Sequence, residues 1–190
     1  MNNIFLTNDD KNFKSGKTAL NLETWKLLTS NPEILNYIQG VSLIPDFSNV
    51  PKNKNTIKFS EEENFHLFCE LEKFCEKQII NKVFPISHQV ISNVFLRNKS
   101  DGTFRVILNL SNLNEKVGKV HFKMDSLNTV LNVIKKGAWF GKIDLKDAYY
   151  SIPIDKSSRK FFRFYSQGEL YEYNVSPRVF WTLREFSQKL

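Results

Sequence analysis

Two apolar runs on either side of an Asp-Gly pair constrain the fold most strongly. The first run covers residues 90–96 and the second covers 104–110, with Asp101-Gly102 between them. Runs rich in β-branched and aromatic residues favour strands, and Asp-Gly favours the positive φ angles of a tight turn. The sequence therefore predicts a β-hairpin in this region.

Other strands are predicted in the second half of the chain. Residues 160–165 and 169–174 are rich in aromatic residues, and Gln167-Gly168 between them indicates a second hairpin turn. Residues 139–145 are largely apolar and end in charged residues, which predicts a buried strand.

The clearest predicted helix begins after Ser60. Ser60 and Glu63 have the spacing of a capping box, in which each side chain bonds the backbone N–H of the other residue. Apolar residues then recur at helical spacing, which predicts a face toward the core. That face consists of Phe65, Phe68, Leu71, Phe74 and Cys75.

Further helices are predicted on both sides of this one. Residues 21–38 suggest two short helical pieces divided at Pro32, and residues 124–136 form a helical pattern that Gly137 can end. Ser176-Pro177 predicts the start of a last helix. Mixed hairpins and helices of this kind indicate an α+β fold. We expect a partly disordered N-terminal leader over 1–57 and one domain over 58–190.

The composition supports a folded, basic protein. Hydrophobic residues make up 41% of the chain, which excludes an intrinsically disordered protein, and the net charge is +7. A basic excess of this size favours a polyanionic partner such as nucleic acid, although many soluble proteins are basic without binding one.

Cysteines and apolar runs point to an intracellular location. Cys69 and Cys75 are six positions apart in one predicted helix and face different sides, so we expect no disulfide between them. The N-terminus is polar and charged, and no apolar run is long enough to span a membrane. These features predict a cytoplasmic or nuclear protein that is not secreted and has no membrane partner.

The segment 143–150 (Ile-Asp-Leu-Lys-Asp-Ala-Tyr-Tyr) carries the residues best suited to chemistry. Asp144 stands at the end of the predicted strand, and Asp147 follows three residues later. A carboxylate on a rigid strand end is well placed to bind Mg²⁺, which prefers oxygen ligands. The spacing alone also fits a structural role, in which Asp144 ends a strand and Asp147 caps a turn.

The block Lys142–Ile154, which contains this segment, and three earlier blocks, in the family's order, resemble the reverse transcriptases of long-terminal-repeat (gypsy-like) and DIRS-type retrotransposons. The similarity continues through Arg159–Phe164 and Gly168–Tyr173. The earlier blocks are Asn93–Arg105, Val106–Asn114 and His121–Met124.

The resemblance implies a partial right-hand polymerase, with a fingers hairpin and an incomplete palm sheet backed by helices. In that family nucleotidyl transfer uses two Mg²⁺ ions, an RNA template, a DNA primer and deoxynucleoside triphosphates. By resemblance, Asp144 is the catalytic metal ligand, and the backbone carbonyl of Leu145 adds a ligand. Asp147, Ala148 and Tyr149 would line the incoming nucleotide, with Tyr149 as the steric gate against a ribose 2′-hydroxyl.

Cations supply the remaining predicted contacts. By resemblance, Arg105 binds the triphosphate, and Lys99 is the best nearby candidate to help it. Lys142, Lys160 and Arg163 are candidates for contacts with template or primer phosphates, which would make binding sensitive to salt. For all of these cations, an ordinary solvated surface charge is the alternative.

Two departures from the family pattern lead us to expect an inactive, truncated polymerase. The usual Leu-Pro-x-Gly turn is absent near Val175, and the family's Tyr-x-Asp-Asp motif does not occur in these 190 residues. One carboxylate cannot give two Mg²⁺ ions their near-octahedral ligation. The alternatives are a nucleic-acid-binding module without catalysis, or a basic, Phe-rich fragment that binds proteins.

Overall fold

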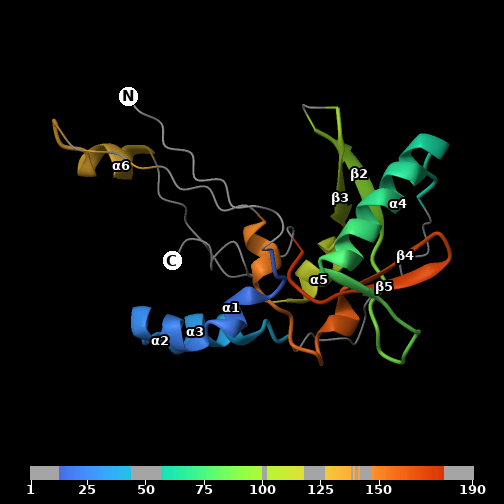
Figure 1. Ribbon diagram of the computed structural model, residues 1–190, viewed down its shortest axis with the longest axis horizontal. Helices are drawn as coiled ribbons and strands as arrows, with labels where there is room; N and C mark the ends of the chain where they lie inside the picture. The colour runs from blue at the N-terminus through green and yellow to red at the C-terminus, as the bar shows by residue number, and fades with distance from the viewer. Residues whose placement is uncertain are drawn as a thin grey trace.

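The computed structural model describes residues 13–43, 57–99, 102–117, 127–137, 139, 141 and 147–177. A helical N-terminal part lies beside a body of two small sheets and one long helix (Figure 1). The helices are α1 Lys17–Leu20, α2 Leu22–Leu28, α3 Pro32–Gln39, α4 Glu61–Glu76, α5 Ser111–Lys116, α6 Leu127–Val133, and the 3₁₀ turns η2 Ala148–Ser151 and η3 Arg159–Phe161. The strands are β1 Ile80–Lys82, β2 Val94–Asn98, β3 Phe104–Leu108, β4 Arg163–Ser166 and β5 Glu169–Tyr173.

Both predicted hairpins are confirmed. Strands β2 and β3 pair antiparallel as a separate two-stranded sheet, which stands upright beside α4 (Figure 1). Strands β4 and β5 pair antiparallel around Gln167-Gly168, and β1 joins the other side of β5 to give the order β1-β5-β4. The mixed helix-and-sheet class expected from the sequence is therefore observed.

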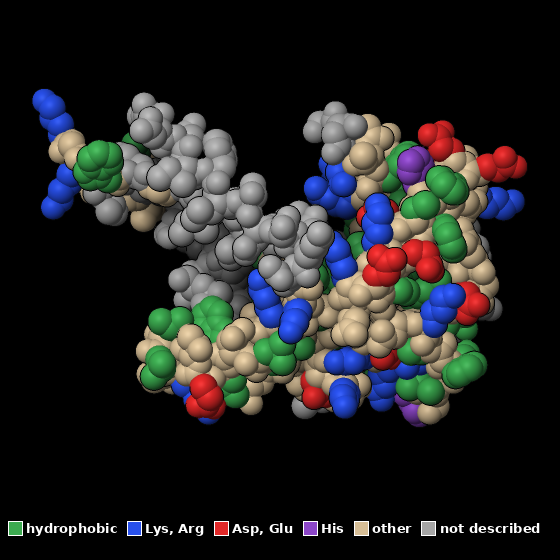
Figure 2. Space-filling model, viewed as in Figure 1, with side chains coloured by type: hydrophobic (Ala, Val, Ile, Leu, Met, Phe, Trp, Pro, Cys, Tyr) green, Lys and Arg blue, Asp and Glu red, His purple; other side chains and the backbone are tan. Residues whose placement is uncertain are grey.

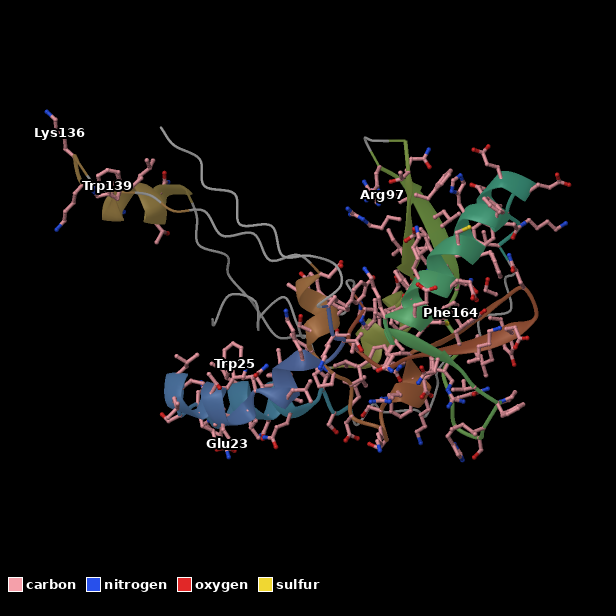
Figure 3. The ribbon with its side chains drawn as sticks, viewed as in Figure 1. Glu23, Trp25, Arg97, Lys136, Trp139 and Phe164 are labelled. Atoms are coloured by element: carbon pink, nitrogen blue, oxygen red, sulfur yellow. The ribbon has the colours of Figure 1, made fainter. Side chains whose placement is uncertain are left out.

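One hydrophobic core joins α4, both sheets and the N-terminal helices. Its aromatic centre is the β4–β5 hairpin, where Phe164 is fully buried and its ring stacks on that of Tyr171 with centroids 5.3 Å apart (Figure 3). Ile38 of α3 and Leu71 of α4 are buried in the same cluster. The N-terminal helices therefore pack on the body that carries the hairpins.

The capping box at the start of α4 is confirmed, but the predicted buried face is partly wrong. Leu67 and Leu71 are the buried residues of the helix, whereas Phe65 is 65% exposed and Phe68 is 47% exposed. The difference arises because α4 packs against β1 and β3 along the side that carries the two leucines. Phe74 and Cys75 are partly buried against the core, as expected.

Replacing Ser60 by alanine tests the capping box. The Ser60 hydroxyl accepts a hydrogen bond from the Glu63 N–H at 3.1 Å, and the Glu63 carboxylate accepts one from the Ser60 N–H at 2.9 Å. Ser60→Ala is expected to lower the free energy of unfolding by about 1 kcal/mol. Urea denaturation measures the change, with Ser87→Ala, at an exposed turn, as the control. Equal losses in the two variants would contradict the prediction.

The predicted N-terminal helices are confirmed, with Pro32 in the first turn of α3 and the Asn31 side chain capping it. Helix α6 ends at Val133, before the predicted end at residue 136, and residues 124–126 of the predicted helix lie outside the described residues. Leu131 and Ile134 of the predicted helix are 55% and 42% exposed. Trp139 is fully exposed and not in a strand. Residues 140 and 142–145 of the strand predicted over 139–145, and residues 178–190 of the last helix, lie outside the described residues.

Two other sequence-based expectations can be compared with the described chain. Cys69 and Cys75 are both free thiols, as predicted. Among the described residues, none of the helices combines the length and the hydropathy that crossing a membrane requires.

Candidate functional site

Three cations lie on one face of the β2–β3 hairpin. In the antiparallel register Arg97 is directly opposite Arg105, and directly opposed residues point to the same face of a sheet. Lys99 follows Arg97 by two positions, so it continues that face. All three residues are exposed. Figure 3 shows Arg97 on the side of the hairpin that faces away from α4. Arg97, Lys99 and Arg105 are called the hairpin cation face below.

The hairpin cation face carries uncompensated positive charge. Across the described part of the chain, no acidic side chain forms an ion pair with any of its three members. Like charges placed directly opposite each other, as in Arg97 and Arg105, destabilise an antiparallel pair. An arrangement that costs stability and attracts anions is typical of a binding surface.

The sequence analysis missed Arg97 although the signal was present. Its position two residues before Lys99 follows the alternation of a strand, and the Asp101-Gly102 turn sets it near Arg105. By resemblance, Lys99 had been the best of the cations near Arg105, and Arg97 was not singled out.

A cavity of about 180 Å³ brings the hairpin together with two other parts of the chain. Lys99 and Arg105 line it from the hairpin, and Asp147 lines it from the turn that precedes η2. These three residues were all predicted to bind a nucleotide. Figure 2 shows Lys and Arg side chains below the tip of the hairpin and toward the C-terminal end of α4. The other lining residues are Glu70, Lys73, Phe74, Lys77, Ile79, Phe104, Val106 and Tyr150.

Helix α4 and the turn after it add two lysines that the sequence did not single out. Lys73 pairs with Glu70 at 2.7 Å, and this hydrogen bond and the Glu70 charge raise the pKa of Lys73. Lys77 lies at the end of the helix with its Nζ 5.5 Å from the centroid of the Phe13 ring. The cavity therefore holds four cations and two carboxylates, a net positive environment that suits a phosphate group.

The turn at Asp147 is held in an unusual backbone conformation. Asp147 has a φ of 53°, and its carbonyl accepts a hydrogen bond from the Tyr150 N–H at 2.9 Å as η2 begins. The buried Tyr150 ring packs edge-on against Phe74 of α4, with centroids 5.6 Å apart. A non-glycine residue at positive φ needs such support from its surroundings.

Two predicted nucleotide-binding residues lie beside the cavity rather than in its wall. Ala148 and Tyr149 are half-buried and do not line it, and Tyr149 packs against the hydrophobic core. The structure places the following residue, Tyr150, in the cavity wall instead. The steric-gate role of Tyr149 stays a prediction.

The predicted metal ligands Asp144 and Leu145 and the predicted nucleic-acid contact Lys142 lie outside the described residues. Within the described ranges, no group of three His, Cys, Asp or Glu side chains could hold a metal ion. Asp147 alone does not fit the several oxygen ligands that Mg²⁺ requires. The Mg²⁺ site therefore stays a prediction from the family resemblance.

Arg163 was predicted to contact nucleic acid, but the structure gives it an internal role. Its side chain is only 6% exposed, and its Nε donates a hydrogen bond to the Glu172 carboxylate at 2.7 Å. A second nitrogen donates to the Phe84 carbonyl at 3.2 Å and to the Gln89 side chain at 2.6 Å. A guanidinium buried in this way is not presented to a phosphate. Lys160 is half-buried, with its Nζ 5.2 Å from the Phe161 ring centroid.

A larger cavity of about 580 Å³ has none of the three residues of the hairpin cation face in its wall. Residues from β4, from the segment before β2 and from the chain before α4 line it, and Lys58 is the one charged residue among them. Ser166 is among the lining residues, and its buried hydroxyl has no hydrogen-bond partner within the described part of the chain. A single lysine in the wall is a poor match for a highly charged anion, whereas the smaller cavity has four cations.

Comparisons with known proteins relate the chain to viral polyproteins. No family model matches it. It is 36% identical over 78 residues to the Gag-Pol polyprotein of Walleye dermal sarcoma virus, covering 40% of this chain and 4% of that protein. It is 25% identical over 76 residues to polyprotein P3 of Commelina yellow mottle virus, again covering 40% and 4%. The chain thus spans a small part of these relatives.

Solved structures share the fold. The crystal structure of Prototype Foamy Virus protease-reverse transcriptase superposes with a TM-score of 0.62 at 15% identity, over 75% of this chain and 19% of that one. A foamy viral protease-reverse transcriptase in complex with double-stranded DNA gives a TM-score of 0.52 at 15% identity, over 70% and 22%. Sequence and fold together support a similarity of this chain to a reverse transcriptase segment of the retroviral and retroelement kind.

Proposed function

We propose that this chain forms the nucleotide-binding fingers and front palm of an RNA-directed DNA polymerase, arranged as in a right-hand polymerase. The carrying observation is the 180 Å³ cavity, in which Lys99 and Arg105 of the hairpin meet Asp147 of the turn before η2. These residues come from regions far apart in the sequence. Their meeting at one basic cavity supports a common ligand that is anionic and phosphate-bearing.

A deoxynucleoside triphosphate fits this environment by charge. The guanidinium of Arg105 can donate two parallel hydrogen bonds to phosphate oxygens, and the ammonium of Lys99 adds a point charge. Arg97 extends the positive surface along the same face of the hairpin. In the complete polymerase, the family resemblance assigns metal binding for nucleotidyl transfer to Asp144 and Leu145, and sugar selection to Tyr149.

Binding of a fluorescent deoxynucleoside triphosphate tests the proposal directly. Saturable binding is expected, with a Kd that rises steeply as salt increases from about 50 to 200 mM, because charge neutralisation dominates the interaction. Unlabelled triphosphate should displace the probe, whereas the uncharged nucleoside should not. Absence of binding at low salt, or a Kd independent of salt, would contradict the proposal.

A second candidate function is binding of nucleic acid without catalysis. The observation in its favour is that a structural neighbour was solved in complex with double-stranded DNA. Binding of a labelled RNA–DNA hybrid separates the two candidates. If the cavity serves a triphosphate, excess triphosphate leaves hybrid binding largely unchanged, whereas a shared phosphate surface gives competition. Asp144→Asn should preserve hybrid binding under the second candidate.

A further inference from the structure

The short segment 13–18, called the N-terminal strap below, is bonded to the turn that carries the cavity residues Asp147 and Tyr150. The Gly16 N–H donates to the Tyr150 carbonyl at 2.9 Å. The Thr18 hydroxyl donates to the Ser151 carbonyl at 2.8 Å, across 133 positions of sequence. The strap thus reaches a site that belongs to the other half of the chain.

The carbonyls of the four consecutive residues 150–153 each accept a hydrogen bond, and the strap supplies two of the four donors. Tyr150 and Ser151 are buried, so their carbonyls cannot turn to water if a donor is lost. The four bonds are Gly16 N–H to Tyr150 O, Thr18 Oγ1 to Ser151 O, Ser176 N–H to Ile152 O and Val41 N–H to Pro153 O, at 2.8–2.9 Å. The Tyr150 N–H in turn bonds the Asp147 carbonyl at 2.9 Å, which links the strap to the cavity.

The other end of the strap contacts the turn after α4. The Ser15 hydroxyl donates to the Gln78 carbonyl at 3.0 Å, and the Phe13 ring lies 5.5 Å from the Lys77 Nζ. Lys77 is another cavity residue. The strap therefore touches two of the three parts of the chain that form the cavity, and it is not itself in the cavity wall.

Close packing at Gly16 restricts where the strap can lie. Gly16 has a φ of +65°, and a Cβ added to it would come within 3.3 Å of the Pro153 Cβ. Any larger residue would be strained in its backbone and would push the strap away from the 150–153 segment.

We propose that the N-terminal strap is a positioning element for the nucleotide site, with Gly16 and Thr18 as positioning residues. They hold Asp147 and Tyr150 in place relative to Lys77 without contacting the ligand. This inference rests on the proposed function of the 180 Å³ cavity, but the structural coupling between the strap and residues 147–152 can be measured without any ligand.

The first test compares two threonines of the N-terminal region in the whole chain. Thr18→Val removes the hydroxyl that donates to the Ser151 carbonyl at 2.8 Å and that also lies 3.2 Å from the Ile38 carbonyl. Thr29→Val removes an acceptor for the Asn31 N–H in the loop between α2 and α3, remote from the cavity. Thr18→Val is expected to raise the Kd for a fluorescent deoxynucleoside triphosphate about tenfold, because small displacements of positioned groups are costly. Thr29→Val should leave that Kd within about twofold, and Thr18→Ser should restore it.

Hydrogen–deuterium exchange of the unliganded protein tests the coupling itself. Peptides covering 147–152 are expected to exchange faster in Thr18→Val than in the unmodified protein, and at the unmodified rate in Thr29→Val and Thr18→Ser. If the unmodified protein binds no triphosphate, the proposed function fails while faster exchange still supports the strap. If Thr18→Val and Thr29→Val behave alike in exchange and in affinity, the strap inference is overturned.

If Thr18→Val does not fold, a second pair of variants can test the same coupling between the strap and residues 147–152. Gly16→Ala and Gly137→Ala both place a side chain at a positive φ, of +65° and +85°, but an added Cβ at Gly137 has no neighbour within 4 Å among the described residues. Gly16→Ala should speed exchange over 147–152 and weaken triphosphate binding, and Gly137→Ala should do neither. Identical behaviour of the two variants would also overturn the inference.

Discussion

Arg105→Ala is expected to weaken binding of a deoxynucleoside triphosphate by about tenfold to a hundredfold, since a hydrogen bond between charged groups contributes roughly 1.5–3 kcal/mol. Arg105 lines the cavity, has no ion-pair partner among the described residues, and opposes a second arginine across the hairpin. Its removal therefore takes away attraction for the ligand without leaving a buried carboxylate unpaired. Arg105→Lys should recover only part of the affinity, because an ammonium lacks the planar fork of donors.

Fluorescence titration at constant salt measures this effect, and two variants control for general loss of positive charge. Arg97→Ala is expected to weaken binding less than Arg105→Ala, since Arg97 shares the face but does not line the cavity. Lys156→Ala removes an exposed cation in the turn between η2 and η3 and should have almost no effect. Equal losses in Arg105→Ala and Lys156→Ala would show that only net charge matters, and would refute the assigned role.

Local signals in the sequence were sufficient to predict the β2–β3 hairpin and the start of α4. The hairpin around Asp101-Gly102 and the capping box at Ser60 depend on residues only a few positions apart, so their structures follow from short-range geometry. The face that α4 buries depends instead on where β1 and β3 meet it. For this reason the helical spacing predicted Phe65 and Phe68 on the buried face of α4, although both are exposed.

Only part of the candidate site was predictable, because some of its residues meet through contacts between distant parts of the chain. The family resemblance indicated Lys99, Arg105 and Asp147, and the structure brings them to one cavity. The contribution of Lys77 requires the end of α4 to lie beside the turn at Asp147, and nothing local in the sequence specifies that. The strap likewise depends on a contact between the first and last parts of the chain.

The internal role of Arg163, by contrast, could have been found from the sequence. A two-residue turn at Gln167-Gly168 pairs 166 with 169 and, continuing outward, places Arg163 directly opposite Glu172. Opposite charges in directly opposed positions stabilise an antiparallel pair. The prediction of a nucleic-acid contact considered the charge of Arg163 and not its cross-strand partner.

Arg163→Ala is expected to produce the largest loss of stability among the substitutions considered, about 3–5 kcal/mol, because it leaves a largely buried carboxylate without its partner. Glu172 is 13% exposed and would have to remain charged in an apolar surrounding or take up a proton. The same substitution removes the bonds that hold the Phe84 carbonyl and the Gln89 side chain. The loop before β2 would then lose its anchor to β4.

Urea denaturation measures the loss, and an exposed ion pair of the same length is its matched control. Lys26 and Glu23 of α2 are also 2.7 Å apart, but their side chains are 49% and 84% exposed. Lys26→Ala should therefore cost less than about 1 kcal/mol. Replacing both members of the buried pair, in Arg163→Met with Glu172→Leu, should cost less than the two single substitutions added together, because neither charge is then left unpaired. Neither residue lines the cavity at Lys99 and Arg105, so a folded double variant should still bind the triphosphate. Loss of binding in that variant would instead indicate that Arg163 contributes to the ligand site.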